Sequence, residues 1–226
     1  YLANLRQRHP VLLLDAGDLF QGTLVSNLGE GQAVIAAYNV LGYDGAAIGN
    51  HEFDYGPAGA LTVPATAADD PTGALKARIA EAKFPFLSAN ILDKKTGQPV
   101  AWPNTYPFRK LSIGGVPIGV IGAVTEDTPR TTNVLNLRDV TISPIVPAVR
   151  AAAAALRQQG VAAVVLTVHE GANCSSFSNP RDVTACKNND ERVLSLVAAL
   201  DGAVDAVVGG HSHAGIAHFV GEVPVV

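Results

Sequence analysis

The chain has 226 residues, of which 48% are hydrophobic and 16% are charged, and this balance excludes an intrinsically disordered or fibrous protein. Its formal charge of −4 comes without a run of Lys or Arg, which argues against nucleic acid as a partner held through its phosphates. Gly, Pro or a charged residue interrupts every hydrophobic run before the roughly 20 residues that a membrane span needs, so we expect a soluble protein.

The first half of the sequence alternates short apolar runs with segments of helical periodicity. The expected elements are a strand at 11–14, a helix at 31–41 that stops at Gly42, a strand at 46–48, a helix at 74–84 and a strand at 86–91. Asp70 or Thr72 is the expected N-cap of the second helix, because both side chains accept hydrogen bonds from backbone N–H groups.

The second half repeats the same alternation. Residues 108–124 are expected to form a hairpin, because two β-rich runs meet across Gly114 and Gly115. The remaining expected elements are a helix at 144–159, ended by Gly160, and strands at 161–168 and 204–208. No linker, internal repeat or low-complexity tract divides the sequence, so we expect one α/β domain.

Polar side chains follow four of the expected strands. They are Asp18, Asn50, His51, His169, His211 and His213. Each has a simpler explanation when taken alone, since Gly and Asn are common turn formers and a histidine after a strand is most often bonded to a backbone carbonyl. Because ligands bind at the carboxyl ends of strands in α/β sheets, the repetition favours a functional site at one sheet edge.

The chemistry of these side chains indicates a metal site. A carboxylate, an amide oxygen and imidazoles without a thiolate suit Zn, Mn or Fe better than a structural Cys-rich zinc site. A carboxylate such as Asp18 is able to bridge two cations. Two metal ions roughly 3.5 to 4 Å apart are a standard device for displacement at phosphorus.

Cys174 and Cys186 flank a polar stretch rich in Ser, Asn and Asp, where a buried structural thiol would be out of place. One interpretation is two free surface thiols. The other is a disulfide, which we favour because an exported protein would oxidise such a pair.

Four motifs in this order resemble those of the calcineurin-like metallophosphoesterases. They are GD at 17–18, GNHEFD at 49–54, HEG at 169–171 and GGHSH at 209–213. Within that superfamily the sequence is most similar to the metallophosphatase domain of bacterial 5′-nucleotidases, which are usually exported. The resemblance extends over nearly the whole chain and implies a layered fold of two packed mixed β-sheets flanked by helices.

The resemblance also assigns a role to each polar residue and implies two divalent metal ions as cofactors. Asp18 corresponds to the metal-bridging carboxylate, and His213 to a ligand of one metal. The remaining ligands of the other metal correspond to Asn50, His169 and His211. His51 resembles the histidine that contacts the substrate phosphoryl group, with Asp54 as its orienting partner, whereas Glu52 and Asp15 are expected to be structural.

The sequence departs from this family at its two ends. The family has an Asp-x-His motif of metal ligands upstream of GD, and no Asp-x-His precedes Asp18 here. The sequence begins at Tyr1 and contains no Met, so we expect a trimmed product that starts after that motif. The family's nucleotide-binding C-terminal domain is absent as well. We therefore interpret residues 1–226 as one metallophosphatase domain truncated at both ends, and expect its own C-terminal domain in the full-length protein.

By this resemblance the expected function is hydrolysis of a nucleoside 5′-monophosphate to nucleoside and phosphate by a hydroxide that two metals activate, in nucleotide catabolism. The expected location is the periplasm or outside the cell. One alternative is a related dinuclear hydrolase that acts on cyclic nucleotides, nucleotide sugars or sulfur-linked esters. Another is a binding scaffold without catalysis, against which the presence of both His51 and Asp54 argues.

Overall fold

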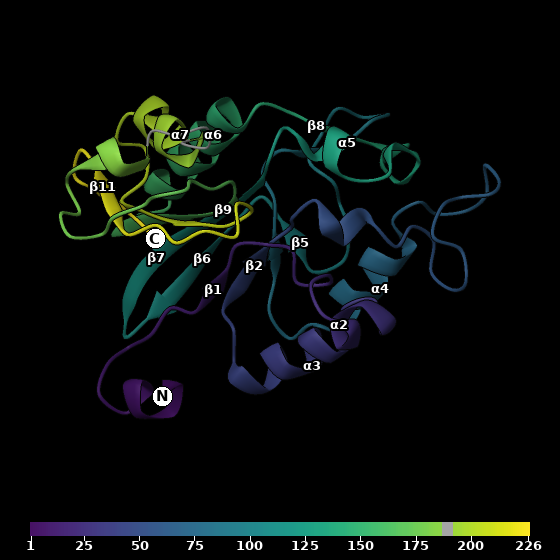
Figure 1. The fold of residues 1–226 in the computed structure, drawn as a ribbon, viewed down its shortest axis with the longest axis horizontal. Coiled ribbons are helices and arrows are strands. Elements are labelled where there is room, and N and C mark those ends of the chain that lie inside the picture. Colours follow the sequence, from purple (N-terminus) through teal and green to yellow (C-terminus); the bar gives the residue numbers. More distant parts are fainter. Residues whose placement is uncertain (187–191) are drawn as a thin grey trace.

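The computed structural model describes residues 1–186 and 192–226, which form two main β-sheets between two groups of helices (Figure 1). Helices α6 (Ile145–Gln158) and α7 (Arg192–Leu200) lie on one side of the strands. Helices α3 (Gln32–Leu41) and α4 (Gly73–Glu81) lie on the other side. The predicted layered α/β fold with two packed sheets is confirmed.

The first sheet belongs to the N-terminal half of the chain and is entirely parallel, whereas mixed sheets were expected. It consists of β1 (Leu14–Asp15), β2 (Gly45–Ala47), β3 (Phe86–Leu87) and β5 (Thr105–Tyr106), in the order β1-β2-β3-β5. Phe20, Ile35, Phe53 and Ile79 form its core with α3 and α4. The shorter helices of this region are α1 (Leu2–Arg6), α2 (Leu24–Leu28) and the single-turn 3₁₀ helix η1 (His51–Phe53).

The second sheet contains the predicted hairpin and the last strands of the chain. Its strands are β6 (Phe108–Ile113), β7 (Val116–Val124), β9 (Ala163–His169), β10 (Ala206–Gly209), β11 (His218–Val220) and β12 (Val223–Val225), in the order β11-β12-β10-β9-β7-β6. The four inner strands are parallel and the two edge strands are antiparallel. A Cβ at Gly119 would lie 2.7 Å from the Leu156 side chain, so this glycine permits the close approach of α6 to β7.

The expected strand at 86–91 is two strands in different sheets. Its last part begins β4 (Ile91–Asp93), which pairs with β8 (Val140–Ile142). The break occurs at Asn90, whose buried amide group donates to the Val124 carbonyl and accepts from the Val124 N–H, at 2.8 and 2.9 Å. This side chain occupies both backbone groups of Val124 at the end of β7, at the point where the chain passes from one sheet to the other. Between β7 and β8 lie α5 (Thr128–Thr131) and η2 (Val134–Leu137), and η3 (Val183–Cys186) precedes α7.

The other expected elements are present with shifted ends. The strand expected at 11–14 is limited to β1, and His169 is the last residue of β9 rather than the first residue after it. Thr72 occupies the N-cap position of α4 without a capping hydrogen bond, and its hydroxyl donates to Asp70 Oδ1 instead. Among the described residues, no helix combines the length and apolarity needed to cross a membrane.

The two sheets touch near their carboxyl ends. A Cβ at Gly122 of β7 would lie 2.2 Å from the Leu87 carbonyl oxygen, so only glycine allows these backbones to approach so closely. The Thr167 hydroxyl donates to the carbonyl of Asp15 at 2.7 Å, which joins β9 to β1. The loops that leave both sheets therefore meet in one place.

Candidate metal centre

The loops after β1 and β2 are held together by the buried carboxylate of Glu52. It accepts hydrogen bonds from the N–H groups of Asp18 (2.8 Å), Gly49 (2.5 Å) and Phe20 (3.1 Å). Only 1% of Glu52 is exposed, and burial raises the pKa of its carboxyl to about 7. Gly17 makes this contact possible, because a Cβ there would lie 2.7 Å from the Gly49 nitrogen. The structural role expected for Glu52 is confirmed.

Asp15 also has the structural role expected of it. Its Oδ1 accepts the N–H of Gly17 at 2.8 Å, and its Oδ2 accepts the Tyr38 hydroxyl at 2.7 Å. These bonds shape the turn in which Gly17 and Asp18 both adopt the left-handed conformation, with φ of 94° and 65°. The turn directs the Asp18 carboxylate towards the second sheet, where Oδ2 meets His169.

His169 provides the fixed point of the cluster from the second sheet. The residue is fully buried, and its Nδ1 lies 2.8 Å from the carbonyl oxygen of Ala16. A carbonyl only accepts hydrogen bonds, so Nδ1 is the protonated nitrogen. In the neutral ring, Nε2 therefore presents a lone pair to the site.

Three further polar atoms converge on that nitrogen. The Nε2 of His169 lies 3.0 Å from Asp18 Oδ2, 3.0 Å from Asn50 Oδ1 and 3.0 Å from His211 Nδ1. An unprotonated Nε2 has no hydrogen to share with the carboxylate and amide oxygens, whereas a divalent cation binds this set of carboxylate, amide and imidazole ligands. The ligand atoms of Asp18, His169 and His211 all lie within 4.8 Å of one another. The donor set thus fits a metal ion.

The electrostatics of the cluster favour a positive charge at the same point. Burial raises the pKa of Asp18, but the hydrogen bond and charge of His169 and the N–H of His51 lower it below its ordinary value. Burial lowers the pKa of His169, but its hydrogen bond and charge interaction with Asp18 raise it above the ordinary value. A bound cation would supply this positive charge.

The predicted pair of His51 and Asp54 lies beside the cluster, where His51 begins η1 and Asp54 is its C-cap. His51 Nδ1 is 2.5 Å from Asp54 Oδ2, and both side chains are about one quarter exposed, at 28% and 26%. The backbone N–H of His51 donates to Asp18 Oδ1 at 2.9 Å. The other oxygen of Asp54 accepts the hydroxyl of Thr132 at 2.8 Å. Sequence reasoning missed Thr132, because no local motif marks a residue so far along the chain.

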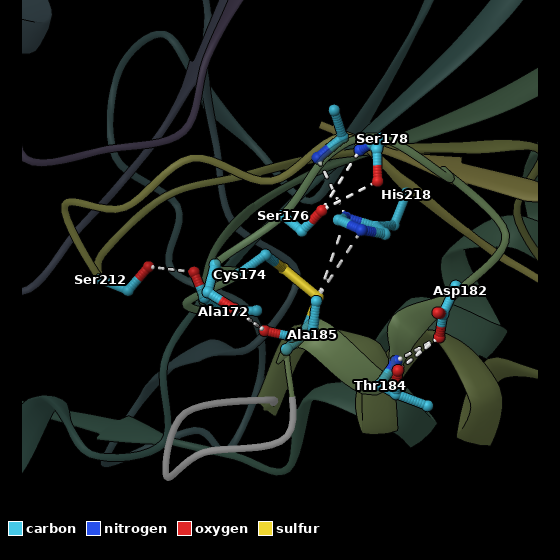
Figure 2. The surroundings of a disulfide bond; sticks show 12 residues. Ala172, Cys174, Ser176, Ser178, Asp182, Thr184, Ala185, Ser212 and His218 are labelled. Carbon is cyan, nitrogen blue, oxygen red and sulfur yellow. Dashed lines mark hydrogen bonds between the residues drawn. A yellow bond between two sulfur atoms is a disulfide. The ribbon is translucent and has the colours of Figure 1, made fainter.

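The remaining predicted ligand, His213, is exposed and lies in the loop after β10 with a φ of 53°. Its assignment to a second metal stays a prediction. Ser212 fixes this loop by donating its hydroxyl to the Ala172 carbonyl at 2.9 Å (Figure 2). A Cβ at Gly171 would lie 2.2 Å from the Gly210 carbonyl oxygen, so the loops after β9 and β10 pack backbone against backbone.

The predicted disulfide between Cys174 and Cys186 is confirmed (Figure 2). Both cysteines are buried although most residues between them are exposed, and neither is a free thiol. The buried ring of His218 lies beside the bond, with Nδ1 3.8 Å from Cys186 Sγ. Cys174, Cys186 and His218 form a second cluster of residue types that bind metals. Because both sulfur atoms are joined in the disulfide, we assign this cluster a structural role.

The chain is similar to several 5′-nucleotidases. A snake venom 5′-nucleotidase from Crotalus adamanteus is 34% identical over 216 residues, which cover 94% of this chain and 30% of that protein. A 5′-nucleotidase from Rattus norvegicus is 38% identical over 130 residues, 57% of this chain and 20% of that protein. The crystal structure of a 5′-nucleotidase precursor from Thermus thermophilus superposes with a TM-score of 0.73 at 29% identity, over 94% of this chain and 34% of that one.

The chain spans about a third or less of the length of these relatives, as the covered shares of 30%, 20% and 34% indicate. The calcineurin-like phosphoesterase family matches residues 1–215, which contain every residue of the site described above. Members of this family are enzymes that use divalent metal ions. The order of the four motifs, the two packed sheets and this match agree, and the chain belongs to the calcineurin-like phosphoesterase family.

Proposed function

We propose that this chain is the catalytic domain of a 5′-nucleotidase that hydrolyses nucleoside 5′-monophosphates to nucleoside and phosphate. The observation that carries the proposal is the convergence of three polar atoms, each at 3.0 Å, on His169 Nε2, beside the paired side chains of His51 and Asp54. The nucleotide specificity is taken from the relatives, two of which bear the name 5′-nucleotidase over 94% and 57% of this chain.

The residues of the cluster would hold one divalent ion, with Zn, Mn or Fe as the ions that suit them. These residues are Asp18, Asn50, His169 and His211. Asp18 would also contact a second ion, to which His213 would contribute. Such ions, when bound, lower the pKa of water and offset the charge of phosphoryl oxygens.

His51 would act on the phosphoryl group and the leaving oxygen. Asp54 accepts a hydrogen bond from Nδ1, which orients the ring and favours the imidazolium, in which both nitrogens carry a proton. In that form Nε2–H would stabilise developing charge or give its proton to the leaving alkoxide. The N–H bond from His51 to Asp18 keeps this ring next to the metal ligands.

The proposal includes an exported protein with a further domain. The disulfide between Cys174 and Cys186 is consistent with an oxidising compartment, which favours the periplasm or secretion. One relative is a venom protein. We attribute recognition of the nucleoside to a C-terminal domain of the full-length protein, since these relatives are about three times as long as this chain or longer.

Metal analysis and a substrate panel test the proposal in the full-length protein. After chelation and reconstitution with Mn or Zn, we expect two equivalents of metal and release of phosphate from nucleoside 5′-monophosphates in preference to an aryl phosphate. Preferred cleavage of a cyclic nucleotide, a nucleotide sugar or a sulfur-linked ester would instead identify a related hydrolase. Less than one equivalent of metal, or nucleotide binding without turnover of any ester, would contradict an active metal enzyme.

A further inference from the structure

Thr132 links the His51–Asp54 pair to a distant part of the chain. Its hydroxyl donates to Asp54 Oδ1 at 2.8 Å across a sequence separation of 78 residues. The other oxygen of Asp54 accepts from His51. Each oxygen of the carboxylate thus has a different partner, one on the imidazole and one on a threonine that follows α5. With both oxygens bonded, rotation of the carboxylate would break at least one hydrogen bond.

The segment that carries Thr132 is itself held in position at its start. The hydroxyl of Thr125, directly after β7, donates to Glu170 Oε2 at 2.9 Å, and Glu170 is the residue after the buried His169. The hydroxyl of Thr128 donates to the Thr125 carbonyl at 2.7 Å, and the Thr132 N–H donates to the Thr128 carbonyl at 3.2 Å. This series of bonds connects the end of the second sheet to the position of Thr132.

The segment is also held beyond Thr132. Asn136 is fully buried, and its amide donates to the carbonyls of Phe53 (2.8 Å) and Thr62 (3.0 Å). Phe53 belongs to η1 together with His51. Residues 125–136 therefore bridge the second sheet and η1. The Asn136 amide also lies 3.5 Å from the backbone carbonyl of Asp54, whereas the Thr132 hydroxyl bonds the Asp54 carboxylate itself.

We propose that Thr132 is a positioning residue that holds Asp54 in the orientation in which it fixes the His51 imidazole. The inference rests on the proposed function, because it gives Thr132 a role through the residue that would act on the substrate. A threonine that only stabilised the 125–136 segment would have no reason to donate to the carboxylate that orients the imidazole. The proposal therefore assigns the positioning of Asp54 to the Thr132 hydroxyl and not to its methyl group.

Three variants separate these roles in the full-length, metal-loaded protein. Thr132→Val removes the hydroxyl and keeps the shape, Thr132→Ser restores the hydroxyl, and Thr131→Val is the matched control. The Thr131 hydroxyl donates to the backbone carbonyl of Asp127, the N-cap of α5, at 3.2 Å, so the control loses a local hydrogen bond that does not reach Asp54. We expect Thr132→Val to lower kcat by roughly 10-fold with little change in KM, as expected for a lost hydrogen bond to a charged group.

Two results complete the expected pattern. Thr132→Ser recovers most of the lost kcat, and Thr131→Val leaves kcat unchanged. In an Asp54→Asn background, Thr132→Val causes no further loss, because the two residues act through the same hydrogen bond. Equal losses in the Thr131→Val and Thr132→Val variants, or full additivity with Asp54→Asn, would overturn the proposal and leave only a structural role.

A measurement without turnover keeps the inference separate from the proposed function. The Nδ1–H proton of His51 is observable by NMR in protein labelled at histidine nitrogen, and its signal is assigned by its loss in His51→Ala. We expect Thr132→Val to shift or broaden this signal and Thr132→Ser to restore it. If no ester is hydrolysed but the signal responds in this way, the proposed function fails while the positioning role stands; an unchanged signal refutes that role.

Discussion

The loops that carry the site residues are fixed by different interactions in the two sheets. In the first sheet, the loops that carry Asp18 and Asn50 are joined by one buried carboxylate, Glu52, which lies within the same turn as the ligand it supports. In the second sheet, the 174–186 loop after His169 is closed by a disulfide, and Ser212 ties the preceding residues to the loop of His211.

Under the proposed function, this difference distinguishes the His51–Asp54 pair, which would act on the substrate, from imidazoles that would bind metal. The turn after β2 carries the proposed ligand Asn50 and the His51–Asp54 pair, held by one hydrogen bond within the turn and another to Asp18. The loops of the second sheet would supply His169 and His211, whose spacing depends on contacts between distant loops. Under the proposed function, changes at the His51–Asp54 pair should therefore affect turnover without loss of metal, whereas changes in the loops of the second sheet should affect metal affinity first.

The largest expected effect is the loss of turnover in the His51→Ala variant. We expect kcat to fall by roughly 10²- to 10⁴-fold, the usual contribution of a positioned acid–base group, while both metal ions remain bound. Metal is retained because His51 contacts Asp18 through its backbone N–H, which alanine keeps. By contrast, His211→Ala should lose metal. Steady-state kinetics and metal analysis of both variants check this, and metal loss in His51→Ala would break the comparison.

The second effect concerns the disulfide of the second region. Replacing both Cys174 and Cys186 with Ala should lower the free energy of unfolding by about 3 kcal/mol on a chain-entropy model of a short loop. Metal affinity should fall as well, since this loop adjoins Ala172, to which Ser212 is bonded. Urea unfolding of metal-free protein and calorimetric metal titration measure the two effects. Unchanged stability would mean that the buried contacts alone fix the loop.

The third effect tests the carboxylate of the first region. Glu52→Gln keeps the shape but places an amide donor among three backbone N–H donors, and we expect a loss of about 2 kcal/mol in the free energy of unfolding. Glu81→Gln is the control, because Glu81 forms an ion pair with Arg78 on the surface. Thermal unfolding of both variants checks this. Equal and small effects would show that Glu52 does not hold the two loops.

The smallest expected effect is the pH dependence that Asp70 gives the first region. Burial raises its pKa, but hydrogen bonds from Lys76 and Thr72 outweigh this and lower the pKa below its ordinary value. A lowered pKa stabilises the fold above the pKa of the unfolded chain, near 4, and the contribution disappears as pH falls through the folded value. Asp70→Asn should cost less than about 1 kcal/mol at pH 6, and this cost should shrink as pH falls below the pKa of the unfolded chain. A cost that does not change with pH would contradict this assignment.

Much of the first region could be predicted from sequence because its determinants are local. GNHEFD places the amide, the imidazole and the carboxylate within one turn, and the structure pairs His51 with Asp54 as the motif implies. Helix ends marked by glycine were predicted well, as at Gly42, where φ is 69°. The convergence of the ligands followed from their positions after strands, although these strands belong to two sheets rather than one.

The long-range features could not be predicted because no local pattern specifies them. Asn90 divides an apolar run into β3 and β4 by binding the backbone of Val124, 34 residues away. Thr132 reaches Asp54 in the same way, through a side chain whose partner is fixed only once the two sheets pack. Polar residues that bond across sheets look like ordinary loop residues in a sequence.

The hydrogen bond from His169 to Ala16 joins residues 153 positions apart and has a consequence for folding. Neither sheet alone contains the ligand set, so the metal centre forms only after the first and last thirds of the chain have docked. Contacts of such long range form late in folding, because the cost of closing the intervening loop comes before the gain from the contact. Metal added to a refolding chain should therefore leave the folding rate unchanged and slow unfolding, since it binds only the docked state.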